Sequence, residues 1–174
     1  DDFYEMFPNS VSDTKIGRIT SLGKQVLDSY IDEKKWEGEG VIFASLSNSP
    51  INGELEDIRE KIGKDMSLFL TTVRIPHDTF EEESNSKIKK FVEENDHTYL
   101  IDWYAASEGH DEYFDADDTH LLSAGAKAYA NCIKEAVLDA YKKENIEIPK
   151  SRLVSSTDTS TDSSNDSSTN ASTE

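Results

Sequence analysis

A histidine three residues after an aspartate is the pair in this sequence best suited to proton transfer. His120 follows Asp117 at that spacing. An imidazole exchanges protons near neutral pH, and a nearby carboxylate holds its tautomer and stabilises the imidazolium. The spacing alone is a weak signal, because His97 follows Glu94 in the same way. An ordinary loop histidine therefore stays an alternative for His120.

Two other residues have the chemistry to stabilise a negatively charged oxygen. Asn48 carries an amide donor, and the backbone N–H of Gly17 is easily approached because glycine has no Cβ. Each also fits an ordinary turn residue. No serine follows an expected strand in a Gly-Asp-Ser turn, so the set lacks a nucleophile.

Arg74 and Trp103 are weaker substrate-binding candidates. The guanidinium of Arg74 is suited to an anionic group, although pairing with one of the many acids is the favoured alternative. Trp103 is suited to stacking on a sugar ring, whereas a core position is the commoner fate of such a side chain.

The elements that must position these residues alternate between apolar runs and amphipathic stripes. Runs rich in β-branched and aromatic residues predict strands at 41–44, 68–73 and 98–101, and a short strand is expected at 11–16. Helical stripes occupy 22–31, 55–62, 88–92 and 126–141, with Ser123 as the expected N-cap of the last. This order predicts an α/β fold with three αβα layers around a parallel sheet.

Position in this fold separates the candidates from other polar residues. Ligands of an open parallel sheet bind beyond the carboxyl ends of its strands. All five candidate segments follow an expected strand, whereas His97 precedes one and falls on the opposite rim. Position therefore favours His120 over His97 as the functional histidine.

Composition excludes several classes of protein. The 174 residues carry 18 Lys and Arg against 36 Asp and Glu, a formal net charge of −18, which disfavours nucleic acid and anionic membrane surfaces as partners. Cys132 is the one cysteine, so neither an internal disulfide nor a thiolate metal site is expected. No Gly-rich phosphate loop or metal-ligand cluster occurs, and the expectation is no cofactor and no metal.

The chain divides into a domain and a polar tail. Residues 1–148 are expected to form one domain, and the Ser/Thr/Asp/Asn-rich segment 149–174 is expected to be disordered because it offers almost nothing to bury. The chain begins without Met or a signal segment, so residue 1 is interpreted as an internal point of a longer protein.

Several motifs in order resemble the SGNH domain of the peptidoglycan O-acetyltransferases, extracellular parts of larger acyltransferases. The resemblance runs from about residue 3 to residue 142, and the segments that carry it are 7–9, 13–18, 72–76, 100–104, 113–121 and 124–126. It implies a serine esterase-like fold that moves acetyl groups onto or off cell-wall carbohydrate. It also implies that His120 is the general base, Asp117 its orienting acid, and Asn48 and Gly17 the oxyanion site.

The resemblance further implies that the family's Gly-Asp-Ser nucleophile and first strand lie upstream of this chain. The parent protein would carry an upstream transmembrane acyltransferase region and act at the extracellular face of a bacterial membrane or in the cell wall. Two segments depart from the family pattern and put activity in doubt. The chain has Leu46-Ser47-Asn48-Ser49 where the family commonly reads Gly-Thr-Asn-Gly, and Asp117-Asp118-Thr119-His120 where it reads Asp-Gly-x-His. The alternatives are an inactive carbohydrate-binding module of the same fold and an interaction domain.

Overall fold

The fold of residue 7 and residues 10–146 is described by a computed structural model. The expected boundary at residue 148 and the polar tail 149–174 lie outside these described residues. Within them, no helix is long and apolar enough to cross a membrane.

Three parallel strands form the sheet. They are β1 (Gly40–Phe43), β2 (Ser67–Thr71) and β3 (Thr98–Ile101), in the order β1-β2-β3. Leu68 of β2 stands opposite Val41 on one side and Thr98 on the other. Every residue of β2 is buried, which explains why the central strand reads as an unbroken apolar run. The three strands predicted from these runs are confirmed.

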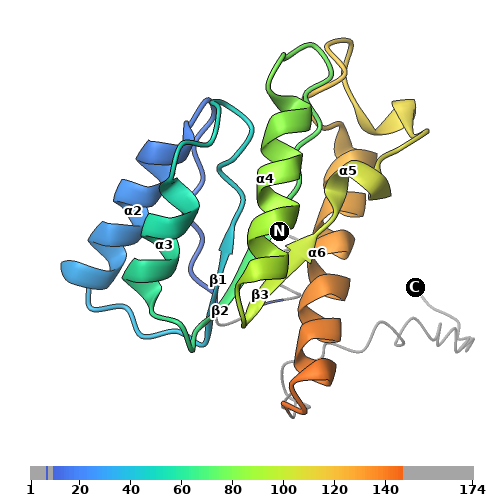
Figure 1. The fold of residues 1–174 in the computed structure, drawn as a ribbon. Helices are drawn as coiled ribbons and strands as arrows, with labels where there is room; N and C mark the ends of the chain where they lie inside the picture. The colour runs from blue at the N-terminus through green and yellow to red at the C-terminus, as the bar shows by residue number, and fades with distance from the viewer. Residues whose placement is uncertain (1–6, 8–9, 147–174) are drawn as a thin grey trace, which may run out of the picture.

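Helices cover both faces of the sheet (Figure 1). Leu68 and Leu70 of β2 pack in one hydrophobic cluster, with side chains of α2 (Thr20–Asp32), α3 (Glu54–Ile62) and α4 (Glu81–Glu94). Phe69, which points to the other face because strand side chains alternate, packs with α6 (Ser123–Lys143). The predicted three-layer αβα arrangement is therefore observed.

Two local predictions are wrong. The segment 11–16 forms no strand, and Val11 and Ile16 are 58 % and 92 % exposed. These are the only apolar residues of the six, and within the described residues the segment pairs with no strand. Ser123 is the first residue of α6 rather than its cap, because the carbonyl of Leu122 already accepts a hydrogen bond from the amide of Ala126.

The loops that follow the strands meet at one end of the molecule, the top of Figure 1. After β3 the chain forms the short helix α5 (Trp103–Ala106) and the 3-10 turn η1 (Asp111–Tyr113) before α6 begins. An antiparallel bridge between Phe114 and Leu121 closes a loop just ahead of α6. This loop carries Asp117 and His120.

Candidate active site

Asp117 and His120 form a hydrogen-bonded pair at the rim of the sheet. The Nδ1 atom of His120 lies 2.6 Å from Oδ2 of Asp117. The second carboxylate oxygen accepts the backbone amides of Thr119 and His120, at 3.0 and 2.9 Å. The carboxylate is therefore fixed by its own loop while it orients the ring. Within the described residues, Nε2 of His120 has no hydrogen-bond partner and is open to solvent, since 71 % of the side chain is exposed.

These contacts shift the pKa values of both groups. The backbone amide and the ring of His120, followed by the amide of Thr119, lower the pKa of Asp117 to about 2. The hydrogen bond and the charge of Asp117 raise the pKa of His120 above its ordinary value. The pair is thus a carboxylate that stays charged and an imidazole made more basic, which suits a general base.

The loop around this pair is fixed from both sides. The amide of Asp115 donates to the carbonyl of His120 at 2.8 Å, and the amide of Asp118 donates to the carbonyl of Asp115 at 2.9 Å. At the start of α6, Gly125 packs so closely on Tyr113 that a Cβ there would overlap the Tyr113 carbonyl. The glycine lets α6 begin directly beneath the loop.

A hydrogen bond links Asn48 to the turn that contains Gly17. The Asn48 amide donates to the carbonyl of Arg18, the residue after Gly17, over 3.2 Å. Ser45 donates to the same carbonyl at 3.0 Å, and Ser49 accepts the amide of Thr20 at 3.2 Å. Gly17 has φ +68°, a conformation that glycine adopts without strain. The turn before α2 is therefore fastened to the loop after β1.

Arg74 and Trp103 take different places. The guanidinium carbon of Arg74 lies 5.4 Å from the centre of the Tyr104 ring, at the rim. Trp103 is only 5 % exposed and packs among aromatic rings of Tyr113, Phe114 and Tyr129. As a stacking platform for a sugar, Trp103 is corrected to a core residue, because its large ring is buried by the loop before α6.

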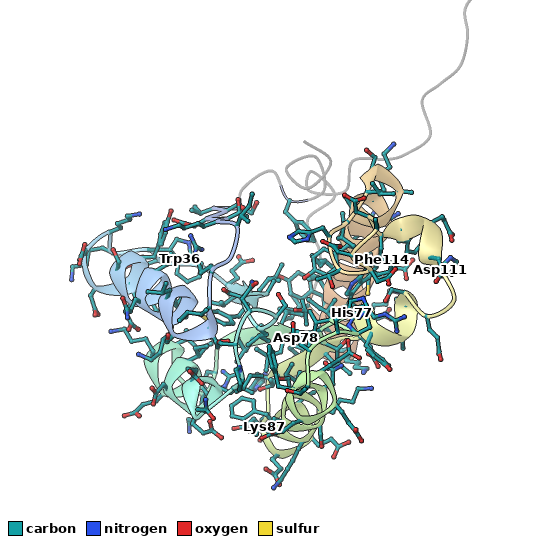
Figure 2. All side chains as sticks on the ribbon, turned by 90° about the horizontal axis from the view of Figure 1, so that it is seen from above. Trp36, His77, Asp78, Lys87, Asp111 and Phe114 are labelled. Atoms are coloured by element: carbon teal, nitrogen blue, oxygen red, sulfur yellow. The ribbon has the colours of Figure 1, made fainter. Side chains whose placement is uncertain are left out.

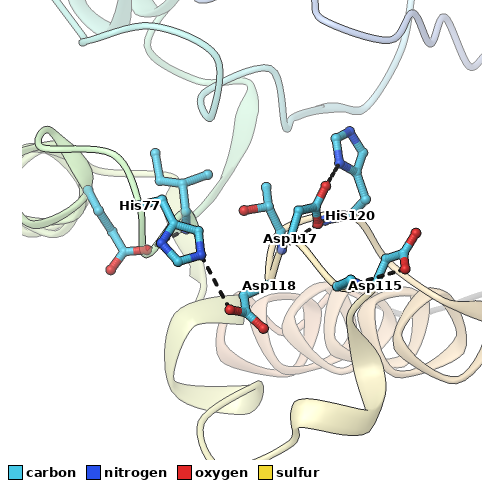
Figure 3. Close-up of polar contacts among 9 residues, drawn as sticks. His77, Asp115, Asp117, Asp118 and His120 are labelled. Carbon is cyan, nitrogen blue, oxygen red and sulfur yellow. Dashed lines mark hydrogen bonds and ion pairs between the residues drawn. The ribbon is translucent and has the colours of Figure 1, made fainter.

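The structure adds a contact that the sequence did not indicate. Nε2 of His77 lies 3.3 Å from Oδ2 of Asp118, so the loop after β2 touches the loop of the candidate pair (Figure 3). Seen from above the rim, His77 lies on the side of Asp111 and Phe114, far from Trp36 (Figure 2). No local sequence pattern could indicate this contact, because the two residues are 41 positions apart.

A second missed group fastens the carboxyl ends of β2 and β3. The Thr72 hydroxyl donates to Asp102 at 3.0 Å and accepts the amide of Tyr104 at 2.8 Å. Lys89 of α4 lies 3.2 Å from the other oxygen of Asp102. Among the described residues, no group of three or more His, Cys, Asp or Glu is placed to hold a metal ion.

Comparison with known proteins places the chain in a family. No protein-family model matches it. The O-acetyltransferase OatA of Staphylococcus aureus (strain NCTC 8325 / PS 47) is 31 % identical over 132 residues, which are 75 % of this chain and 22 % of that protein. A second protein of S. aureus (strain COL), provisionally named an O-acetyltransferase, is 29 % identical over 145 residues, or 83 % of this chain and 23 % of that protein.

A solved structure agrees with the sequence match. The C-terminal catalytic domain of peptidoglycan O-acetyltransferase A from Streptococcus pneumoniae, solved with a methylsulfonyl adduct, superposes with a TM-score of 0.71. It is 20 % identical and is matched over 80 % of this chain and 86 % of that domain. The chain belongs to the family of the O-acetyltransferase OatA. It has that family's SGNH-type fold and spans about a fifth of the length of the full O-acetyltransferases it matches, 22 % for OatA.

Proposed function

We propose that this chain is the part of an O-acetyltransferase or esterase domain that supplies the base and the oxyanion site for acetyl chemistry on cell-wall carbohydrate. The family supports the reaction class. The observation that carries the proposal is the 2.6 Å contact of His120 with Asp117, which leaves Nε2 of the ring without a partner in the described chain. The nucleophilic serine is supplied by a segment outside residues 1–174.

The mechanism follows from the proton that each group can hold. Asp117 keeps the proton of His120 on Nδ1, so the lone pair of Nε2 removes the proton from the serine hydroxyl as its oxygen attacks the acetyl carbonyl. The backbone amide of Gly17 donates to the oxyanion, and so does the side-chain amide of Asn48 once it gives up its 3.4 Å contact with the Ser47 hydroxyl. Collapse breaks the ester C–O bond, and the imidazolium returns its proton to the leaving alkoxide. A sugar hydroxyl or water then attacks the acetyl-serine by the same steps.

The open edge of β1 is the place where a strand bearing the serine would add. In the described residues β1 pairs only with β2, so the backbone groups of its other edge have no ladder partner. The loop after this strand holds Asn48 against the turn of Gly17. A parallel strand added there would end beside both oxyanion donors, because parallel strands share their carboxyl rim.

The wider setting is part of the same proposal. The parent protein acts on peptidoglycan-like carbohydrate as acyl donor or acceptor, at the extracellular face of the bacterial membrane or in the cell wall. It carries a transmembrane acyltransferase region upstream. The support is the family, together with the name of the S. pneumoniae domain as part of a peptidoglycan enzyme.

One departure from the family pattern is compatible with activity. Asp118, where the pattern has glycine, adopts φ +55°, so the loop keeps a left-handed residue at this position. Aspartate tolerates that region better than most side chains. The alternative, an inactive carbohydrate-binding module, would keep the pair without the chemistry.

The test uses the protein extended upstream through its Gly-Asp-Ser segment, assayed on a chromogenic acetyl ester. His120→Ala should lower kcat by roughly 10³-fold or more, because the serine loses its base. His110→Ala is the matched control, since His110 makes a similar 2.8 Å contact with Glu112 in the neighbouring turn. Equal losses in both variants, or an upstream sequence without the serine, would refute the enzyme assignment.

A further inference from the structure

The turn that carries Gly17 is held by one arginine. Within the described residues, every hydrogen bond made by segment 11–17 has Arg18 as its donor. The guanidinium donates to the carbonyl of Asp13 at 2.9 Å and to the Asp13 carboxylate, and the backbone amide donates to the carbonyl of Lys15 at 3.4 Å. Because no strand pairing supports this segment in the described part of the chain, the place of Gly17 depends on these contacts.

The guanidinium of Arg18 is committed to Asp13 rather than open to a ligand. Only 12 % of the Arg18 side chain is exposed, and both terminal nitrogens donate to Asp13. A forked, charge-assisted contact of this kind fixes geometry, and a lysine cannot reproduce it because its ammonium is a single point charge. We name the two residues the Asp13–Arg18 clamp.

The backbone N–H of Gly17 is accessible at this turn. It makes no hydrogen bond within the described residues, and a Cβ added to Gly17 would meet nothing within 4 Å. A donor stabilises a developing oxyanion best when it is already in place, because no free energy is then spent on moving it during the reaction. A turn held by side-chain contacts therefore needs its clamp for this donor to be effective.

The backbone carbonyl of Arg18 sets the direction of the Asn48 amide. It accepts the Asn48 side chain at 3.2 Å and the Ser45 hydroxyl at 3.0 Å, which occupies both of its lone pairs. A carbonyl cannot donate, so the nitrogen end of the Asn48 amide must face it. One N–H of Asn48 is then held by Arg18, and the other is left for the oxyanion.

The loop after β1 is fixed without the clamp. A Cβ on Gly23 of α2 would lie 2.8 Å from Cβ of Ser45, so the helix rests directly on this loop. Ser49 also accepts the amide of Thr20 at 3.2 Å. Loss of the guanidinium should therefore loosen the turn around Gly17 while the loop and α2 stay in place.

We infer that Arg18 is a positioning residue of the oxyanion site. Its guanidinium holds the turn that presents the Gly17 N–H, and its carbonyl holds the Asn48 amide. The inference rests on the proposed function for the reaction that these donors serve. Arg18 acts through the two donors and contacts neither the substrate nor the reacting atoms.

The first experiment measures ester hydrolysis by the protein extended through its Gly-Asp-Ser segment. Arg18→Ala should lower kcat roughly 10- to 100-fold and change KM less than about twofold, because a misplaced oxyanion donor weakens the transition state more than substrate binding. Arg18→Lys should restore only part of the loss. Lys24→Ala is the matched control, since Lys24 forms a partly exposed ion pair with Asp28 on α2 and should leave kcat unchanged. Urea midpoints of the two alanine variants should be close, because such pairs add little stability.

The second experiment needs no activity and uses ¹⁵N relaxation of the full 174-residue chain. The Gly17 amide should have an order parameter near about 0.85 in the wild type and below about 0.6 in Arg18→Ala. Asp13→Ala should lower it as well, which separates loss of the clamp from a change at the neighbouring residue. Lys24→Ala should not change it.

The outcomes distinguish this inference from the proposed function. An active wild type whose kcat is unchanged by Arg18→Ala, or falls equally in Lys24→Ala, would overturn the inference and leave the proposed function standing. An inactive extended wild type would refute the proposed function, and the order parameter of Gly17 would then decide whether Arg18 holds the turn. Equal order parameters in wild type and Arg18→Ala would overturn the clamp in either case.

Discussion

The exposed imidazole of His120 gains its basicity from one neighbour. Asp117 stays ionised down to about pH 2, so its negative charge is present throughout the pH range in which the His120 ring titrates. This charge and the hydrogen bond raise the pKa of His120. We expect the NMR titration of the His120 ring to have a midpoint above 6.5, and Asp117→Asn to return it toward that value. In the extended enzyme, kcat/KM should rise through the same pKa. Glu112→Gln, which removes the carboxylate beside His110, should leave His120 unchanged.

The way in which stability depends on pH follows from the pKa shifts of His120 and Asp117. The raised pKa of His120 adds stability below pH 6.5, and this is lost as pH rises through the folded-state value. The lowered pKa of Asp117 adds stability above its ordinary 3.8, and this is lost as pH falls toward about 2. The pair therefore contributes most between these ordinary values. A pH series of urea midpoints in which wild type and Asp117→Asn differ equally at every pH would contradict this account.

Asp118 is a conformational residue as well as a charged one. Its φ of +55° is costly for a β-branched side chain, so Asp118→Val should lower the free energy of unfolding by about 1–2 kcal/mol. Asp118→Gly should be near neutral, because glycine adopts this region freely and the lost contact with His77 is exposed. Urea midpoints of the two variants measure the difference. Equal destabilisation would show that the charge, rather than φ, matters at this position.

At the scale of elements, the start of α6 sets the place of the candidate pair. Gly125→Ala would push a Cβ into the carbonyl of Tyr113, and backbone on both sides must move. We expect a loss of about 1–3 kcal/mol in the free energy of unfolding and a change in the titration midpoint of His120. Ala124→Ser, at an exposed neighbouring position of α6, should change neither. Calorimetry and the histidine titration provide the two measurements.

Arg59 holds segments of the chain together at the opposite, amino-terminal rim of the sheet. From α3 its guanidinium donates to the carbonyls of Gly63 and Met66 at 2.9 and 2.7 Å, and to the Thr98 hydroxyl at 2.8 Å. The side chain is buried, so Arg59→Ala leaves several acceptors without donors and should cost about 3–5 kcal/mol.

Arg59→Lys tests whether the forked geometry is the cause. One ammonium cannot reach two carbonyls of the loop between α3 and β2 and the hydroxyl on β3 together, so lysine should restore only part of the loss in urea unfolding. Full restoration by lysine would mean that the positive charge alone is sufficient.

For the molecule as a whole, the features that could be predicted are those set by residues close together in the sequence. The apolar runs fix the three strands, and the 3.6-residue stripes fix the helices that cover them. The Asp117–His120 contact could be predicted because two residues three positions apart in one loop lie within reach of each other. The strand expected at 11–16 could not be judged, because a strand needs a partner that a local pattern does not reveal. The burial of Trp103 and the contact of His77 with Asp118 arise from packing between distant segments.

The net charge of −18 is the last property that belongs to the whole chain. Carboxylates that repel one another destabilise the compact state, and salt screens that repulsion over roughly 8–10 Å near physiological ionic strength. We therefore expect the melting temperature to rise as NaCl increases from about 10 to 150 mM. The exposed ion pairs, such as Lys90 with Glu94 at 3.8 Å, weaken over the same range but contribute little. A melting temperature that falls with salt would mean that these pairs outweigh the repulsion, and that the acidic surface is better balanced than its composition indicates.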